Sequence, residues 1–369
     1  MWMLAALLIV GIFLYTVYTM ILIFALTRVK TRMATGKPFV SVVIAARNER
    51  SMIGKCLASL IAQDYPADMF EVIVVDDRSI DGTSEVLSRF QEIWGTLRVI
   101  RVEDTSEDIS PKKRALSSGI GEASGEIIFQ TDADCIVPPS WITGMVPGFE
   151  KGIGMVAGIA PYLAEPGILN SFVRHEYMWN AALSAASIAL GYGTHASGRN
   201  LSFKREVFEH LGGYGSLKKV LSGDDTLFLQ RMRRFTGYKA VTMPDPSTHV
   251  YTHTPNGIKA FLRQRVRHMS TGKYFDPFLI AIGSSFYGFQ IILCIFLLIS
   301  PFSSQAFLFF TGSFLLKCIM DALLASRTKK LFALEIQWKR FLVNELLLMP
   351  YMAVLPLLGL LIKVKWKEK

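Results

Sequence analysis

The sequence predicts an α/β domain with a mostly parallel sheet, flanked by transmembrane helices. Between residues 38 and 275, short apolar runs alternate with helix-like stretches and turn residues, a pattern typical of parallel strands joined by right-handed crossovers. Long apolar runs lie on both sides of this region, and 51% of the 369 residues are hydrophobic. This composition excludes a disordered chain and does not suit an ordinary soluble domain.

The first apolar run contains about 25 residues, enough to cross a hydrocarbon core of roughly 30 Å. We expect residues 1–27 to form an N-terminal membrane anchor. A cleavable signal peptide is the alternative, but no basic residue precedes the run, the run is too long, and no small-residue cleavage site follows it. Basic residues follow the run at once, so the positive-inside rule predicts a cytoplasmic folded domain. These residues are Arg28, Lys30, Arg32 and Lys37.

A C-terminal membrane region is predicted at residues 277–362, followed by a basic tail at 363–369. It contains three hydrophobic segments, at 277–300, 305–325 and 341–362. The basic loop at 327–340 fits the cytoplasm, but the tail would then emerge outside if the last segment crosses fully. Pro350 and Pro356 can interrupt that segment, so its topology stays open. We expect a multi-pass protein of the plasma or inner membrane.

The positions of the charged residues and cysteines indicate which ligands the chain can bind. The formal net charge is +10, and much of the excess lies beside the apolar runs, which favours anionic lipid headgroups over nucleic acid. The four cysteines have neither disulfide-framework nor metal-site spacing. Lys317 and Asp321 lie four residues apart inside an apolar segment, so a helix places them on one face. We expect a mutual pair that helps insertion, with a place beside the acceptor path as the alternative.

Polar residues follow two strands of the predicted sheet. The strands are expected at 39–45, 71–75, 97–102 and 126–130, and the helices at 52–62, 83–94 and 112–123. Ligands bind outside the carboxyl ends of strands in an open parallel sheet, where Asp76 and Asp77 follow the second strand. The first strand ends in Arg47, Asn48 and Glu49. These side chains can bind a base or ribose; solvated turns that cap the next helix are the alternative.

Two acidic motifs and one basic motif follow. Asp132 and Asp134 form a DxD after an apolar strand, where side chains two residues apart point the same way and can hold Mg²⁺ or Mn²⁺ with phosphate oxygens. Asp224 and Asp225 precede a helix-like run at 226–233 and act either as helix caps or as a general base. Gln264 and Arg267, together with the adjacent His268, belong to either a diphosphate-binding face or a membrane-surface helix.

Together and in this order, these four stretches resemble glycosyltransferase family 2, over roughly residues 38–273. The matching motifs read VDDRSIDGT at 75–83, TDAD at 131–134, GDD at 223–225 and QRVRH at 264–268. The resemblance implies the GT-A fold, catalysis by Asp225 with Asp224, and a metal held by Asp134 and Asp132. It also implies donor binding by Arg47, Asn48, Glu49, Asp76, Asp77, Lys112, Lys113, Asp132, Asn200, Gln264, Arg267 and His268.

The activity that the resemblance implies is an inverting, metal-dependent transfer of a sugar from a nucleotide diphosphate sugar, with UDP expected as the nucleotide. The membrane layout is similar to that of ceramide glucosyltransferases, which implies a lipid or hydrophobic-alcohol acceptor. A processive polysaccharide or glycan-chain synthase is the alternative; His268, where the family motif ends in tryptophan, speaks against it. A non-catalytic membrane scaffold is the third reading, and the acidic motifs argue against that.

An apolar, aromatic stretch at residues 171–192 lies inside the predicted cytoplasmic domain. Charged residues interrupt it too strongly for a spanning helix, while its Tyr and Trp residues favour the headgroup level. We expect an interfacial helix with Met178 and Trp179 at the acceptor's entry route. A helix buried in a protein core is the alternative.

Overall fold

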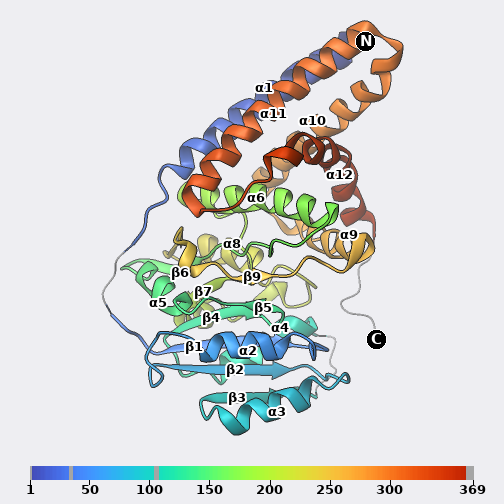
Figure 1. Ribbon diagram of the computed structural model, residues 1–369. Helices are drawn as coiled ribbons and strands as arrows, with labels where there is room; N and C mark the ends of the chain where they lie inside the picture. The colour runs from blue at the N-terminus through green and yellow to red at the C-terminus, as the bar shows by residue number, and fades with distance from the viewer. Residues whose placement is uncertain (1, 33–35, 104–107, 363–369) are drawn as a thin grey trace. The chain divides into compact units, whose positions relative to one another are not determined.

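A computed structural model describes residues 2–32, 36–103 and 108–362 (Figure 1). The predicted basic tail at 363–369 lies outside the described residues. The chain divides into two compact units. The sheet unit contains Val29–Leu163 and Ser187–His253, and the helical unit contains the N-terminal helix, Ala164–Ala186 and the chain from Thr254 onward.

The sheet unit is built on a seven-stranded mixed sheet of order β3-β2-β1-β4-β7-β6-β8 (Figure 1). Its strands are β1 (Val40–Ala46), β2 (Phe70–Asp76), β3 (Leu97–Arg101), β4 (Ile127–Asp132), β6 (Ile153–Ala157), β7 (Leu201–Lys204) and β8 (Lys239–Thr242). Strands β1 to β4 are parallel to one another, whereas β7 runs antiparallel to both β4 and β6. The prediction of a mostly parallel sheet in an α/β domain is confirmed, and its four predicted strands are β1 to β4.

Apolar residues cover both faces of this sheet because side chains alternate along each strand. In β1, Val42 and Ile44 point into one core while Val43 points into the other. The first core includes residues of α2 (Ile53–Ile61), α3 (Thr83–Ile93) and α5 (Trp141–Met145). The second includes residues of α4 (Pro111–Gly121), α7 (Arg205–His210) and α8 (Thr226–Phe235). The sheet unit is therefore a three-layer arrangement, as buried parallel strands require.

Strand register brings the predicted polar turns to one edge. Ala45 of β1 is paired with Val75 of β2 and with Asp132 of β4, so these three strands end at the same level. A short antiparallel pair, β5 (Cys135–Ile136) with β9 (Tyr251–Thr252), follows directly after the DxD. The sequence after β4 is thereby held in place by a segment more than one hundred residues later.

The helical unit contains four helices that are long and apolar enough to cross a membrane, among the residues described. They are α1 (Trp2–Leu26), α10 (Pro277–Ile299), α11 (Ser304–Phe332) and α12 (Phe341–Leu361). The same unit contains most of α6 (Ile168–Ala189) and all of α9 (Gly257–Met269). Helix α12 continues through Pro350 and Pro356 without a break. Helix α11 extends past the predicted end, so its last turns carry the basic residues Lys329 and Lys330.

Helix α6 corresponds to the apolar stretch at 171–192. Met178 and Trp179 are only 4% and 7% exposed, and the Trp179 ring packs against Phe286 of α10 and Tyr15 of α1. The expectation that these two side chains form an accessible interfacial surface was wrong. Aromatic partners that are distant in the sequence bury them, which the local pattern did not reveal.

Candidate active site

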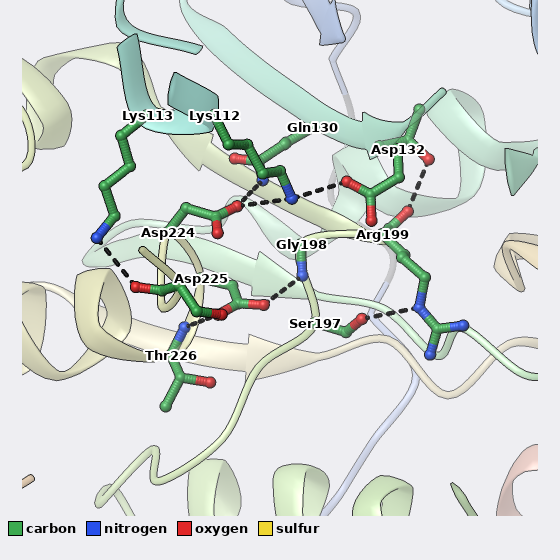
Figure 2. A network of polar contacts seen from close by, with 12 residues as sticks. Lys112, Lys113, Gln130, Asp132, Ser197, Gly198, Arg199, Asp224, Asp225 and Thr226 are labelled. Carbon is green, nitrogen blue, oxygen red and sulfur yellow. Dashed lines mark hydrogen bonds and ion pairs between the residues drawn. The ribbon is translucent and has the colours of Figure 1, made fainter. Parts of the chain in front are cut away.

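A lysine joins two of the predicted acidic motifs. Lys112 lies in the first turn of α4, and its ammonium contacts Asp132 Oδ1 at 2.8 Å and Asp224 Oδ2 at 3.0 Å (Figure 2). The Gln130 amide donates to the same Asp224 oxygen at 3.0 Å. Burial alone would lower the pKa of Lys112, but the two carboxylates more than offset it and hold that pKa well above its usual value. The cluster therefore keeps one fixed positive charge between two negative ones.

Lys113 has a different role from its neighbour. Its ammonium is buried and donates to three backbone carbonyls, those of Leu217, Val220 and Ser222, at 2.9, 2.8 and 3.0 Å. Burial lowers the pKa of Lys113 to about 8. The side chain thus ties down the loop that leads to the acidic pair, and a contact with a donor would require it to leave these carbonyls.

Asp225 is both a helix cap and an oriented carboxylate. Its Oδ1 accepts the Thr226 N–H at the start of α8, and its Oδ2 accepts the Gly198 N–H at 2.8 Å (Figure 2). Burial and the adjacent Asp224 charge raise the pKa of Asp225. Burial also opposes the charge on Asp224, but the Lys112 ammonium more than offsets it, so the pKa of Asp224 lies below its ordinary value. The pKa values of the two carboxylates therefore shift in opposite directions, as in acid–base sites where neighbouring groups take different roles.

Gly198 is a point of close approach in this cluster. A methyl group at this position would lie 2.8 Å from Gln130 Nε2 and 3.2 Å from Asp224 Oδ2. We expect Gly198→Ala to reduce turnover roughly 100-fold, the scale for a catalytic group misplaced by about 1 Å. The measurement is kcat for the expected sugar transfer, and thermal unfolding shows whether the fold is retained.

Gly237→Ala is the matched control for this prediction, because a methyl group there meets nothing within 4 Å and the backbone is not left-handed. It should leave kcat within about twofold. Equal activity of the two variants would mean that the Gly198 approach does not position the acidic pair.

The carboxylates that follow β2 are fully buried. Asp77 is 1% exposed and contacts three guanidinium groups, those of Arg47 at 3.3 Å, Arg78 at 3.0 Å and Arg114 at 3.2 Å. Asp76, also 1% exposed, accepts from the Ser79 N–H and the Ser84 hydroxyl. Neither is a solvated turn residue, so the part of the alternative that made them solvated was wrong. Both carboxylates hold the shape of the loops in which the donor-binding residues were predicted.

The turns after β1 and β2 are also joined to each other. Asn48 adopts a left-handed conformation with φ of 53°; its N–H donates to Ser79 Oγ and its Oδ1 accepts the Ile80 N–H. The Glu49 N–H donates to Thr83 Oγ1. These bonds fix the backbone at the edge where parallel strands end, which is the usual position of a nucleotide site.

Asn200 is completely buried, and protein groups engage its amide. Its Oδ1 accepts from the Trp141 indole, and its Nδ2 donates to the carbonyls of Ile159 and Thr248, each at 2.8 Å. The predicted contact with a donor would therefore require these bonds to be exchanged. Through these bonds, Asn200 just before β7 is connected to Ile159, which follows β6, and to Thr248, which precedes β9.

The second aspartate of the DxD directly precedes the short β5–β9 pair, whose register pairs Cys135 with Thr252. Among residues 2–32, 36–103 and 108–362, no group of three His, Cys, Asp or Glu side chains is arranged to hold a metal ion. A cation here would therefore depend on other oxygen ligands.

The basic motif belongs to the helical unit. Gln264, Arg267 and His268 lie on α9, where Gln264 and Arg267 are half-buried and His268 is exposed. Arg265 lies between them and was not predicted to have a role. Its guanidinium contacts both oxygens of Glu176 on α6, with Nε at 2.9 Å from each, and Tyr351 of α12 donates to the same carboxylate at 2.6 Å. Only the charge of Arg265 signalled this contact, because Glu176 is 89 residues away.

Comparison with protein families agrees with the motif order. A model described as glycosyl transferase family 2 matches residues 41–212. A second, described as glycosyl transferase family group 2, matches residues 127–364 and so covers more than half of the chain. The chain belongs to glycosyl transferase family group 2. The resemblance found from the four motifs is confirmed.

Two curated family relatives are informative. Glycosyltransferase AglE of Haloferax volcanii is 34% identical over 200 residues, which is 54% of this chain and 62% of AglE. Beta-monoglucosyldiacylglycerol synthase of a Synechocystis species is 35% identical over 114 residues, which is 31% of this chain and 23% of that protein. The chain thus matches less than two thirds of the length of either relative.

A solved structure supports the fold. The mannosyltransferase PcManGT from Pyrobaculum calidifontis, in complex with GDP-Man and Mn²⁺, aligns with a TM-score of 0.62 and 23% identity. The alignment covers 90% of this chain and 100% of that one. The family member described here therefore has the predicted GT-A fold.

Proposed function

We propose that this family member transfers a sugar from a nucleotide diphosphate sugar to a lipid or hydrophobic-alcohol acceptor, with inversion, at the cytoplasmic face of the plasma or inner membrane. The observation that carries the proposal is Asp225. It is partly exposed, oriented by two backbone N–H groups and placed beside a charged cluster at the carboxyl edge of the sheet.

The proposed mechanism follows from the acidic pair. Asp225 takes the proton of the acceptor hydroxyl as that oxygen attacks the anomeric carbon, on the side opposite the leaving diphosphate. The raised pKa of Asp225 makes it a stronger base than an ordinary aspartate. Asp224 acts through its neighbour: its charge, held in place by Lys112 and Gln130, contributes to that raised pKa.

The lipid acceptor is supported by relatives and by the helical unit. One relative's name gives it a diacylglycerol product, and another is named a glucosyl-dolichyl phosphate glucuronosyltransferase, 27% identical over 187 residues. Four apolar helices of spanning length would bring the protein to such acceptors. The basic residues that follow α1 support the cytoplasmic side, since positive charge accumulates there.

A divalent cation fits the residues after β4. Asp132 at the end of β4 and Asp134 two residues later supply carboxylate oxygens. Mg²⁺ and Mn²⁺ need few protein ligands when substrate phosphates and water complete the shell. A bound cation would neutralise charge that develops on the leaving diphosphate. Asp132 would have to share its oxygen with Lys112, which already contacts it.

The test of transfer uses the full chain purified in detergent with a panel of nucleotide diphosphate sugars. Slow release of nucleotide diphosphate from one donor, and faster release when a lipid alcohol is added, is the expected result. No hydrolysis or transfer with any donor would contradict the proposal and favour a non-catalytic scaffold.

Asp134→Ala tests the cation assignment. We expect this variant to lose transfer by about 100-fold or more, since charge stabilisation at a leaving group contributes on that scale, while thermal unfolding stays unchanged. The wild-type protein should lose activity in excess chelator and recover it with Mg²⁺ or Mn²⁺. Full activity of Asp134→Ala in excess chelator would overturn the assignment.

A further inference from the structure

The helical unit has a basic pocket at the end of α11. It has a volume of about 560 Å³, and its lining includes Arg174 of α6 with Ser326, Lys329 and Lys330 of α11. The connection from α11 to α12 forms its other wall and runs along α6 (Figure 1). Two contacts hold that connection: Arg174 with Glu335 at 3.0 Å, and Arg340 with the carbonyl of Gly167. The pocket is therefore built by tertiary contacts within one compact unit.

An exposed apolar stripe on α11 leads to this pocket. Leu316, Ile319 and Leu323 are 39%, 56% and 53% exposed. Ser326 and Lys330 continue the stripe at the same three- and four-residue spacing and are also exposed. Residues at this spacing share one helix face, and the distance from Leu316 to Lys330 is roughly 21 Å along the axis. One face of α11 thus changes from apolar to basic over about the length of an acyl chain.

We propose that this pocket binds the phosphate headgroup of an anionic membrane phospholipid, with an acyl chain along the α11 stripe. A phosphodiester offers anionic oxygens to the Lys329 and Lys330 ammonium groups and the Arg174 guanidinium. The apolar stripe offers a contact surface for an acyl chain, and a free phosphate ion has no group that would bind there. Basic pockets between membrane helices bind anionic headgroups in this way.

The charge balance of the lining favours an anion. Arg174, Lys329 and Lys330 contribute three positive charges, and Glu335 contributes one negative charge. The Glu335 side chain is 79% exposed, so it can turn away from Arg174 at little cost. The pocket has a net positive charge even with Glu335 in place. Removing the Glu335 charge should strengthen anion binding.

The experiment measures lipid binding to the full chain in detergent by native mass spectrometry, with phosphatidylglycerol and phosphatidylcholine as probes and no sugar donor. The double variant Lys329→Gln and Lys330→Gln should bind phosphatidylglycerol roughly tenfold more weakly or worse. The matched control replaces Lys55 and Lys151, two exposed lysines of the sheet unit, with glutamine and should bind as the wild type does. Glu335→Gln should bind more tightly, so an effect of opposite sign is tested as well.

Two outcomes would overturn the proposal. The first is equal phosphatidylglycerol binding by the double variant and its control, together with no gain for Glu335→Gln. The second is full competition by millimolar inorganic phosphate, which would make the pocket a simple phosphate site. Retention of phosphatidylglycerol in that phosphate, with weak binding of phosphatidylcholine, supports the lipid assignment. Because no donor is present, the result is independent of the proposed transfer reaction.

Discussion

Replacing Asp225 by asparagine should lower kcat for sugar transfer by about 10²- to 10⁴-fold, the range that a positioned general base contributes. The change removes the base but keeps a capping side chain, since asparagine caps helices about as well as aspartate. The amide oxygen can still accept the Thr226 N–H at the start of α8. The measurement is single-turnover transfer with saturating donor, alongside thermal unfolding. The melting temperature should fall only modestly, because the Gly198 N–H loses its acceptor when an amide NH2 replaces Oδ2.

Asp245→Asn is the matched control. Asp245 caps the short helical turn Pro246–Thr248 by accepting the Ser247 N–H at 2.9 Å, so the same chemical change is made at a second cap. It should leave transfer near the wild-type rate. If Asp225→Asn also keeps a near wild-type rate, Asp225 is a helix cap only and the base must be sought elsewhere.

The pH dependence gives an independent readout of the same residue. The pKa of Asp225 is raised, so the ionised base is present at neutral pH and is lost as the pH falls through this raised value. The acid limb of kcat should therefore lie at higher pH than an ordinary aspartate would give. Asp224→Asn removes one cause of the shift, so the residual activity should show an acid limb moved to lower pH. An unmoved limb would mean that another group titrates.

The sequence predicted the sheet unit well where the signals were local. The boundaries of β1 to β4 differ by at most two residues from those expected, because each strand is a short buried apolar run between turn residues. Strands β6, β7 and β8 were not predicted. Two of them contain only four residues each, and β7 pairs with β4 across more than seventy residues. Strands this short, paired with distant segments, show no local pattern in the sequence from which they could be predicted.

The motifs predicted which polar residues follow the strands, but they did not predict the contacts that these residues make. Lys112 and Lys113 are neighbours in sequence, yet one bridges two carboxylates and the other binds backbone carbonyls. Asp77 was predicted from its place after a strand, but its three guanidinium partners come from three separate segments. Spacing predicts which side chains reach an edge of the sheet. Which partner each one finds depends on charge neutralisation in the folded chain.

The charged residues inside α11 form a larger network than the sequence suggested. The predicted pair is confirmed: Lys317 Nζ lies 2.7 Å from Asp321 Oδ2. The same ammonium contacts Glu345 of α12, whose other oxygen lies 2.8 Å from His175 Nε2 of α6. Tyr15 of α1 donates to Asp321 at 2.5 Å. One lysine thus contacts two fully buried carboxylates, and the network joins four helices of the helical unit.

Lys317→Leu should therefore destabilise the protein by about 3–5 kcal/mol, the cost of breaking a buried ion pair and leaving a charge uncompensated. The measurement is thermal unfolding in detergent, with the exposed Lys259→Leu of α9 as the control. The triple variant with Lys317, Asp321 and Glu345 all changed to leucine should recover part of the loss, because it removes the ammonium and both carboxylates together while leaving His175 and the Tyr15 hydroxyl without these partners. A single variant as stable as the control would mean that the carboxylates become protonated or hydrated at little cost. A triple variant that is more stable than Lys317→Leu would show that the loss comes from the two carboxylates left without their cation.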